Sequence, residues 1–70
     1  MNNSMIWFSI SQLKIKTAQY VLSQIGIESH TINKMDSAHA GLFGDIELYV
    51  AKHHEDKARE TLIEEGILVE

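Results

Sequence analysis

The chain contains no cysteine and few basic residues, and each of these shortages excludes a class of function. Without cysteine there can be no disulfide, no thiolate zinc site and no thiol nucleophile. Six Lys and Arg residues stand against ten Asp and Glu residues, which gives a net charge of -4, and the basic residues are scattered along the sequence. Surfaces that bind nucleic acid or anionic membrane carry clustered basic residues, so we expect neither as a partner.

Long hydrophobic runs are missing as well. The first apolar run, from Met5 to Ile10, is too short for the hydrophobic region of a signal peptide, and no positive charge precedes it. No segment approaches the roughly 18 apolar residues that a transmembrane helix needs. The 70 residues suffice for one domain. We therefore expect a single soluble, cytoplasmic domain over residues 1–70, with its core between residues 5 and 69.

Two segments show the helical periodicity of apolar residues. The first follows Ser9 and Gln12, whose spacing predicts a capping box, and ends at Gly26. The second covers residues 53–65 and ends at Gly66. Both endings read helix–Gly–Ile, so we expect two related halves. The residues expected to face the core are Ile15, Ala18, Val21, Leu22 and Ile25 in the first helix and Ala58 and Leu62 in the second.

The remaining apolar segments have the composition of β-strands. In residues 45–50, alternation predicts that Ile46, Leu48 and Val50 face the core and that Tyr49 faces the opposite side. The polar second strand suits a sheet edge. The predicted strands are residues 5–10, 27–33, 45–50 and 67–69. The order β-α-β-β-α-β predicts an α+β fold: a two-layer ferredoxin-like sandwich with a four-stranded antiparallel sheet and two helices on one face.

Several short motifs carry a family resemblance. They are Val21-Leu22, Gly26-Ile27, Asn33-Lys34, Asp36-Ser37, Ile46-Glu47-Leu48-Tyr49-Val50 and Asp56-Lys57-Ala58. Over residues 7–65 the chain resembles a family of small bacterial proteins to which a signal-transducing role is ascribed without an established function. Those proteins are related in fold to the nitrogen-regulatory PII-like, ferredoxin-like domains. The resemblance implies this fold and a regulatory role, and it assigns no catalytic or ligand residue.

Neither metal binding nor catalysis is expected. Adjacent histidines cannot share one face of a regular helix or strand, and no acidic group has a ligand-like spacing to them. Serine, histidine and aspartate occur, but none stands in a nucleophile elbow or a glycine-rich turn. The single arginine, Arg59, has Glu55 as an ion-pair partner one helical turn away. We therefore predict a non-enzymatic protein without a cofactor, whose histidines His30, His39, His53 and His54 are solvated surface groups.

Trp7 and Tyr49 form the first candidate site. If Ile6 and Phe8 face the helices, Trp7 lies on the open side of the sheet beside Tyr49, although alternation leaves open whether Trp7 or Phe8 is buried. Such a pair stabilises a sheet as a cross-strand contact, or it forms part of a protein interface. RNA-binding domains stack bases on aromatic residues in this position, but Glu47 and the lack of basic neighbours disfavour that use.

The loop over residues 34–44 is the second candidate site, because its eleven residues exceed an ordinary hairpin connection. It offers polar groups and an apolar tip, which either contacts a partner or folds back onto the core. In PII-like proteins the corresponding loop contacts ligand and partner, so the resemblance implies the same use here. The candidate binding residues of this region are Asn33, Asp36, Ser37, Leu42 and Phe43, with His39 as a further polar group.

Two functional hypotheses follow from these features. In the first, the protein is a regulatory or signal-transducing module that binds a protein or a small metabolite through the loop and the open sheet face. In the second, it is a self-associating accessory domain, a homodimer held together by the open face and the polar edge strand. The regulatory module is the first prediction and the accessory domain its alternative. A small core, a free edge and exposed aromatics are the features that motivate self-association.

Overall fold

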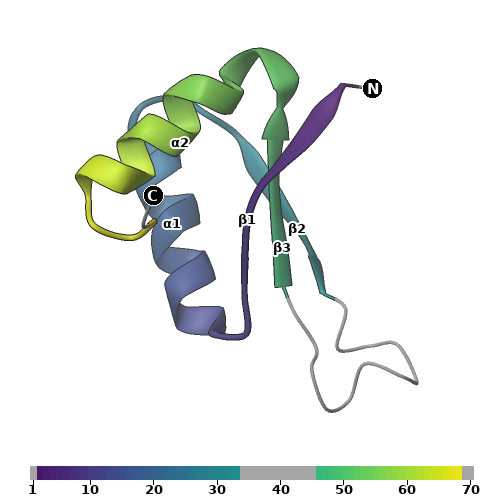
Figure 1. Cartoon of the computed structure of the whole chain (residues 1–70), viewed down its shortest axis with the longest axis vertical. Helices are drawn as coiled ribbons and strands as arrows, with labels where there is room; N and C mark the ends of the chain where they lie inside the picture. Colours follow the sequence, from purple (N-terminus) through teal and green to yellow (C-terminus); the bar gives the residue numbers. More distant parts are fainter. Residues whose placement is uncertain (1, 34–45, 69–70) are drawn as a thin grey trace.

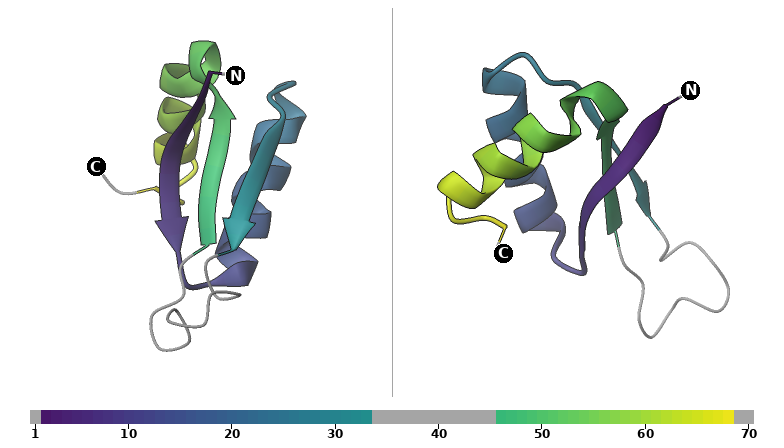
Figure 2. Two further views of the ribbon diagram at one scale, coloured as in Figure 1. Left: turned by 90° about the vertical axis from the view of Figure 1, so that its right-hand side faces the viewer. Right: turned by 45° about the horizontal axis from the view of Figure 1, so that its top comes forward.

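The computed structural model describes residues 2–33 and 46–68, which form a two-layer α+β arrangement (Figure 1). Both helices lie on one face of the sheet, and the opposite face carries no helix within the described residues (Figure 2). In chain order the elements are β1 (Asn3–Ser9), α1 (Gln12–Gln24), β2 (Ser29–Asn33), β3 (Ile46–Ala51), the 3-10 helix η2 (Lys52–His54) and α2 (Glu55–Glu64).

Within residues 2–33 and 46–68 the sheet has three antiparallel strands in the order β1-β3-β2. This arrangement is compatible with a ferredoxin-like fold, and β2 is an edge strand among these residues, as predicted. The predicted strand at residues 67–69 is not formed by its described part. Ile67 and Leu68 make a bend, because their backbone N–H groups both donate to the Leu62 carbonyl at the end of α2, over 2.9 and 3.1 Å. Val69 lies outside the described residues.

The start of α1 differs from the prediction by two residues. Ser11 has extended backbone angles, and its hydroxyl accepts a hydrogen bond from the Lys14 N–H over 3.2 Å, so Ser11 is the N-cap. Ser9 is still part of β1, and its hydroxyl accepts from the Ser11 N–H instead. The capping box predicted from Ser9 and Gln12 was therefore wrong, because Ser9 belongs to β1 and Ser11 caps the helix two residues later.

Both helices end in the same way, which confirms the role of the two glycines. Gly26 and Gly66 have φ angles of 78° and 77°. The N–H of Ile27 donates to the Leu22 carbonyl over 3.0 Å, and that of Ile67 donates to the Leu62 carbonyl over 2.9 Å. With the bond from each glycine to the carbonyl three residues before it, each ending is a Schellman motif. The shared helix–Gly–Ile pattern is thus a repeated local structure.

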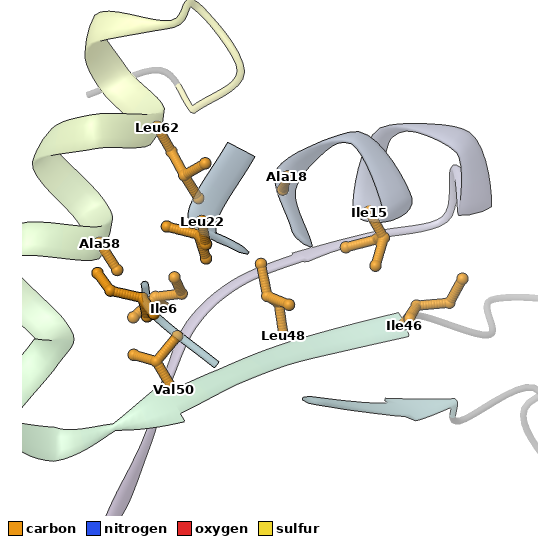
Figure 3. Close-up of a cluster of buried hydrophobic side chains, with 10 residues drawn as sticks. Ile6, Ile15, Ala18, Leu22, Ile46, Leu48, Val50, Ala58 and Leu62 are labelled. Atoms are coloured by element: carbon orange, nitrogen blue, oxygen red, sulfur yellow. The ribbon is translucent and has the colours of Figure 1, made fainter. Parts of the chain in front are cut away.

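The core lies between the sheet and the two helices (Figure 3). The predicted inward residues of β3 and α2 are all buried. In α1, Ile25 is 43% exposed, because it is the C-cap, and Val21 is only partly buried. α2 begins at Glu55, two residues later than predicted, because His53 and His54 belong to η2. The buried residues are Ile6, Ile15, Ala18, Leu22, Ile27, Ile46, Leu48, Val50, Ala58 and Leu62.

Candidate functional site

A β-bulge in β1 decides which aromatic residue reaches the open face. Met5 pairs with Tyr49, but the next pair along the strands is Trp7 with Leu48, so Ile6 is the additional residue. Directly paired residues of neighbouring strands project from the same side of a sheet. Trp7 therefore shares the helix-covered side with Leu48 and packs against the core. The predicted Trp7–Tyr49 pair on the open face was wrong, because a bulge reverses the alternation.

The residue that replaces Trp7 on the open face is Phe8, which pairs with Glu47. On the other side of β3, His30 pairs with Tyr49 and Ile32 pairs with Glu47. Three of the side chains on this face are large, apolar and well exposed: Met5 at 40%, Phe8 at 53% and Ile32 at 45%. We name the following six residues the open-face patch: Met5, Phe8, His30, Ile32, Glu47 and Tyr49.

Tyr49 connects the polar members of the patch. Its ring stacks on the His30 ring, with centroids 5.6 Å apart and planes 9° from parallel. Its hydroxyl donates a hydrogen bond to the Glu47 Oε1 over 2.9 Å. This bond raises the pKa of Tyr49 above its usual value, and partial desolvation and the Glu47 charge act in the same direction. The phenol therefore stays a donor at neutral pH and leaves Glu47 with further acceptor positions.

The predicted site residues do not meet at one surface. Asn33 pairs with the buried Ile46 and is therefore on the helix side of β2, whereas Tyr49 is on the open side. Asp36, Ser37, Leu42 and Phe43, together with His39, lie outside the described residues. Sequence reasoning missed four members of the patch. Alternation would have revealed His30 and Ile32 in β2 and Met5 beside the predicted Trp7, but the position of Phe8 depends on the bulge.

Two of the histidines are neighbours in η2. The ring centroids of His53 and His54 are 4.1 Å apart. His30 is on the sheet, in the open-face patch. Among the residues that the structure describes, no three His, Asp or Glu side chains are placed to hold a metal ion. None of the described helices has the length and apolar character to cross a membrane.

Two hollows follow the seam between α1 and β2. The larger, of about 580 Å³, lies beside the start of β2 and is lined by Tyr20, Glu28 and Ser29 among others. The smaller, of about 50 Å³, lies further along β2 at Thr31. Lys16 and Gln19 of α1 line both. No position on this seam was predicted as a site except Asn33, which borders the smaller hollow.

Comparison with known proteins adds no assignment: no family model, no curated protein and no solved structure matches this chain.

Proposed function

We propose that the protein is a non-catalytic regulatory module that docks a protein partner on its open-face patch. The observation that carries the proposal is the exposure of Met5, Phe8 and Ile32 on a sheet face that no described helix covers. Apolar side chains gathered on one face of so small a domain favour an interface, whereas single exposed apolar residues need no explanation. A signal-transducing role, as the family resemblance implies, would consist of this docking.

The polar members of the patch suggest the chemistry of the partner. Glu47 lies between Phe8 and Ile32 in one row across the sheet, and it has acceptor positions beyond the Tyr49 hydrogen bond. An arginine of the partner can pair with this carboxylate and lie against the Tyr49 ring. The net charge of -4 adds a general attraction for a basic partner. The partner we propose is therefore an apolar protein surface with a basic side chain near its centre.

Self-association through the same patch is the second candidate, because the three apolar side chains are equally available to another copy. A two-fold face-to-face arrangement would bring the Glu47 carboxylates of both copies close together at the interface centre. Like charges that are desolvated together oppose association. We therefore place the heterologous partner first, with the homodimer as the alternative that sedimentation distinguishes.

The four-stranded ferredoxin-like sheet is part of this proposal. In that topology the fourth strand adds to the outer edge of β1, which is unpaired among the described residues. The candidate strand is residues 67–69, and its formation requires Ile67 and Leu68 to leave the bend in which both N–H groups bond to the Leu62 carbonyl. Slow hydrogen exchange at β1 amides that point away from β3 would support it. Exchange there as fast as in an unfolded chain would contradict it.

Phe8→Ser tests the docking proposal, with Leu13→Ser as the matched control. Leu13 is 77% exposed on α1, away from the sheet face, so both variants remove an exposed apolar side chain. A partner isolated with the wild-type protein, then purified, should bind Phe8→Ser at least about tenfold more weakly and Leu13→Ser unchanged. Equal affinity for both variants would contradict docking on the patch. A dimer that Phe8→Ser dissociates would establish the alternative.

A further inference from the structure

The second exposed feature is the edge of β2 that faces away from β3. β2 hydrogen-bonds to β3 on one side, and no other described strand flanks it. The edge lies beside α1 (Figure 2). The two hollows are lined by residues of both elements and follow the seam between them. An unpaired strand edge with a groove beside it is the geometry in which an extended peptide adds to a sheet.

A hydrogen bond shows which backbone groups point into this groove. The Gln19 Nε2 of α1 donates to the Ser29 carbonyl over 3.5 Å, so that carbonyl is directed away from β3. In an antiparallel strand the N–H and C=O of one residue point to the same side, and the direction repeats every second residue. The backbone groups of Thr31 are therefore directed to the same edge. The N–H and C=O groups of Ser29 and Thr31 can therefore bond to an added strand. The Gln19 amide already bonds to one of them, the Ser29 carbonyl, over a long distance of 3.5 Å.

Lys16 is the charged residue nearest to the middle of the groove. It lines both hollows, whereas Glu28 lines only the larger one, so within residues 2–33 and 46–68 Lys16 alone supplies charge beside Thr31 in the smaller hollow. The described residues contain one ion pair, between Arg59 and Glu55, so Lys16 has no carboxylate partner among them. A second copy paired strand to strand about a two-fold axis near Thr31 would bring the two Lys16 side chains toward each other. A foreign strand with a carboxylate at that position would be attracted instead.

We propose that the edge of β2 binds an extended segment of another protein, which carries an acidic side chain on the face turned toward α1. The segment adds as a strand to Ser29 and Thr31, and its carboxylate pairs with Lys16. This site is separate from the open-face patch: it uses the backbone edge and the helix side of β2, whereas the patch uses side chains on the opposite side. It does not depend on the proposed docking function.

The test is titration of the full chain with a designed β-hairpin peptide, followed by amide NMR. The outer strand of the hairpin carries Glu at its centre, on the side that would face α1. We expect the largest shifts at Ser29, Thr31 and Lys16, and slower hydrogen exchange at Thr31. N-methylation of the outer-strand amides that would face β2 should abolish binding, because the methyl groups block the backbone hydrogen bonds to the edge of β2. Phe8→Ser, in the open-face patch, should bind the hairpin as the wild type does.

Exchanging the charges isolates the contribution of Lys16. Lys16→Glu, at an exposed position, should bind the Glu hairpin at least about fivefold more weakly. It should bind a hairpin with Lys at the central position more tightly than the wild type does. Absence of shifts at about 1 mM hairpin, where even a weak complex is populated, would overturn the proposal. So would binding that tolerates N-methylation, or shifts centred on Phe8 and Tyr49.

Discussion

The two faces of the sheet differ in what a side chain there contributes. On the helix-covered face, Leu48 and Val50 are fully buried, and Trp7 packs against the same core. On the open face, Phe8 and Ile32 remain about half exposed although they are equally apolar. Hydrophobicity therefore does not separate the faces. What separates them is strand register: the bulge at Ile6 assigns Trp7 to the first face and Phe8 to the second.

The largest contrast is expected between Leu48→Ala and Ile32→Ala. Leu48 has no exposed surface, so its truncation leaves a cavity and should lower the free energy of unfolding by about 2–5 kcal/mol. Ile32 is 45% exposed and should lose less than about 1 kcal/mol. Urea denaturation of both variants measures the difference. Losses of similar size would show that the faces are not distinct in packing.

The bulge itself is tested by comparing Trp7→Ser with Phe8→Ser. Because Trp7 packs against the core, its replacement should lower the free energy of unfolding by about 2 kcal/mol. Phe8→Ser should change it by less than about 1 kcal/mol. A strand without the bulge predicts the opposite ranking. Chemical denaturation followed by circular dichroism is suitable, because it does not depend on the tryptophan signal.

The helix-covered face also depends on the two helix endings that return the chain to the core. Gly26→Ala and Gly66→Ala place a Cβ at a positive φ, although nothing lies within 4 Å of the added atom at either position. Each should lower the free energy of unfolding by about 1 kcal/mol, through backbone strain alone. Thermal melts of both variants check this. A loss at one position and none at the other would contradict the equivalence of the two Schellman motifs.

The smallest effect is expected on the open face, from the pH dependence of Tyr49. Its pKa is raised in the folded protein, mainly by the hydrogen bond to Glu47. A raised pKa means that the folded state favours the protonated phenol. The stabilisation is thus fully present below the unfolded pKa of about 10 and is lost as the pH rises through the folded pKa. In a Tyr20→Phe background, Glu47→Gln should lower the pKa of Tyr49 in an absorbance titration. An unchanged value would contradict the hydrogen bond.

Local signals in the sequence predicted most of the fold. Alternation placed Ile46, Leu48 and Val50 in the core, and helical periodicity placed Ile15, Ala18 and Leu22 there. The glycine endings were predicted because a positive φ is a property of one residue and its neighbours. The bulge was not predicted. Nothing in the sequence of β1 marks Ile6 as an additional residue, and the bulge becomes visible only in the pairing of β1 with β3.

The candidate site was predicted less completely than the fold. Tyr49 was assigned to the open face by the alternation of its own strand, and the structure confirms that position. Alternation left open whether Trp7 or Phe8 is buried, and the predicted pair of Trp7 with Tyr49 depended on Phe8 facing the helices, which it does not. The seam between α1 and β2 was not predicted, because it depends on the packing of Lys16 and Gln19 beside a distant strand.

The bulge at Ile6 has a consequence for how this surface can change over evolutionary time. Loss of Ile6 would remove the additional residue and leave the other pairs in place, so Met5, Trp7 and Phe8 would then alternate strictly. Trp7 would still face the helices and Phe8 the open side, but the core would lose the buried Ile6 side chain. A single-codon deletion at this position would thus keep the recognition surface and lower the stability of the domain. Homologues that lack this codon would present the same aromatic residue to their partners.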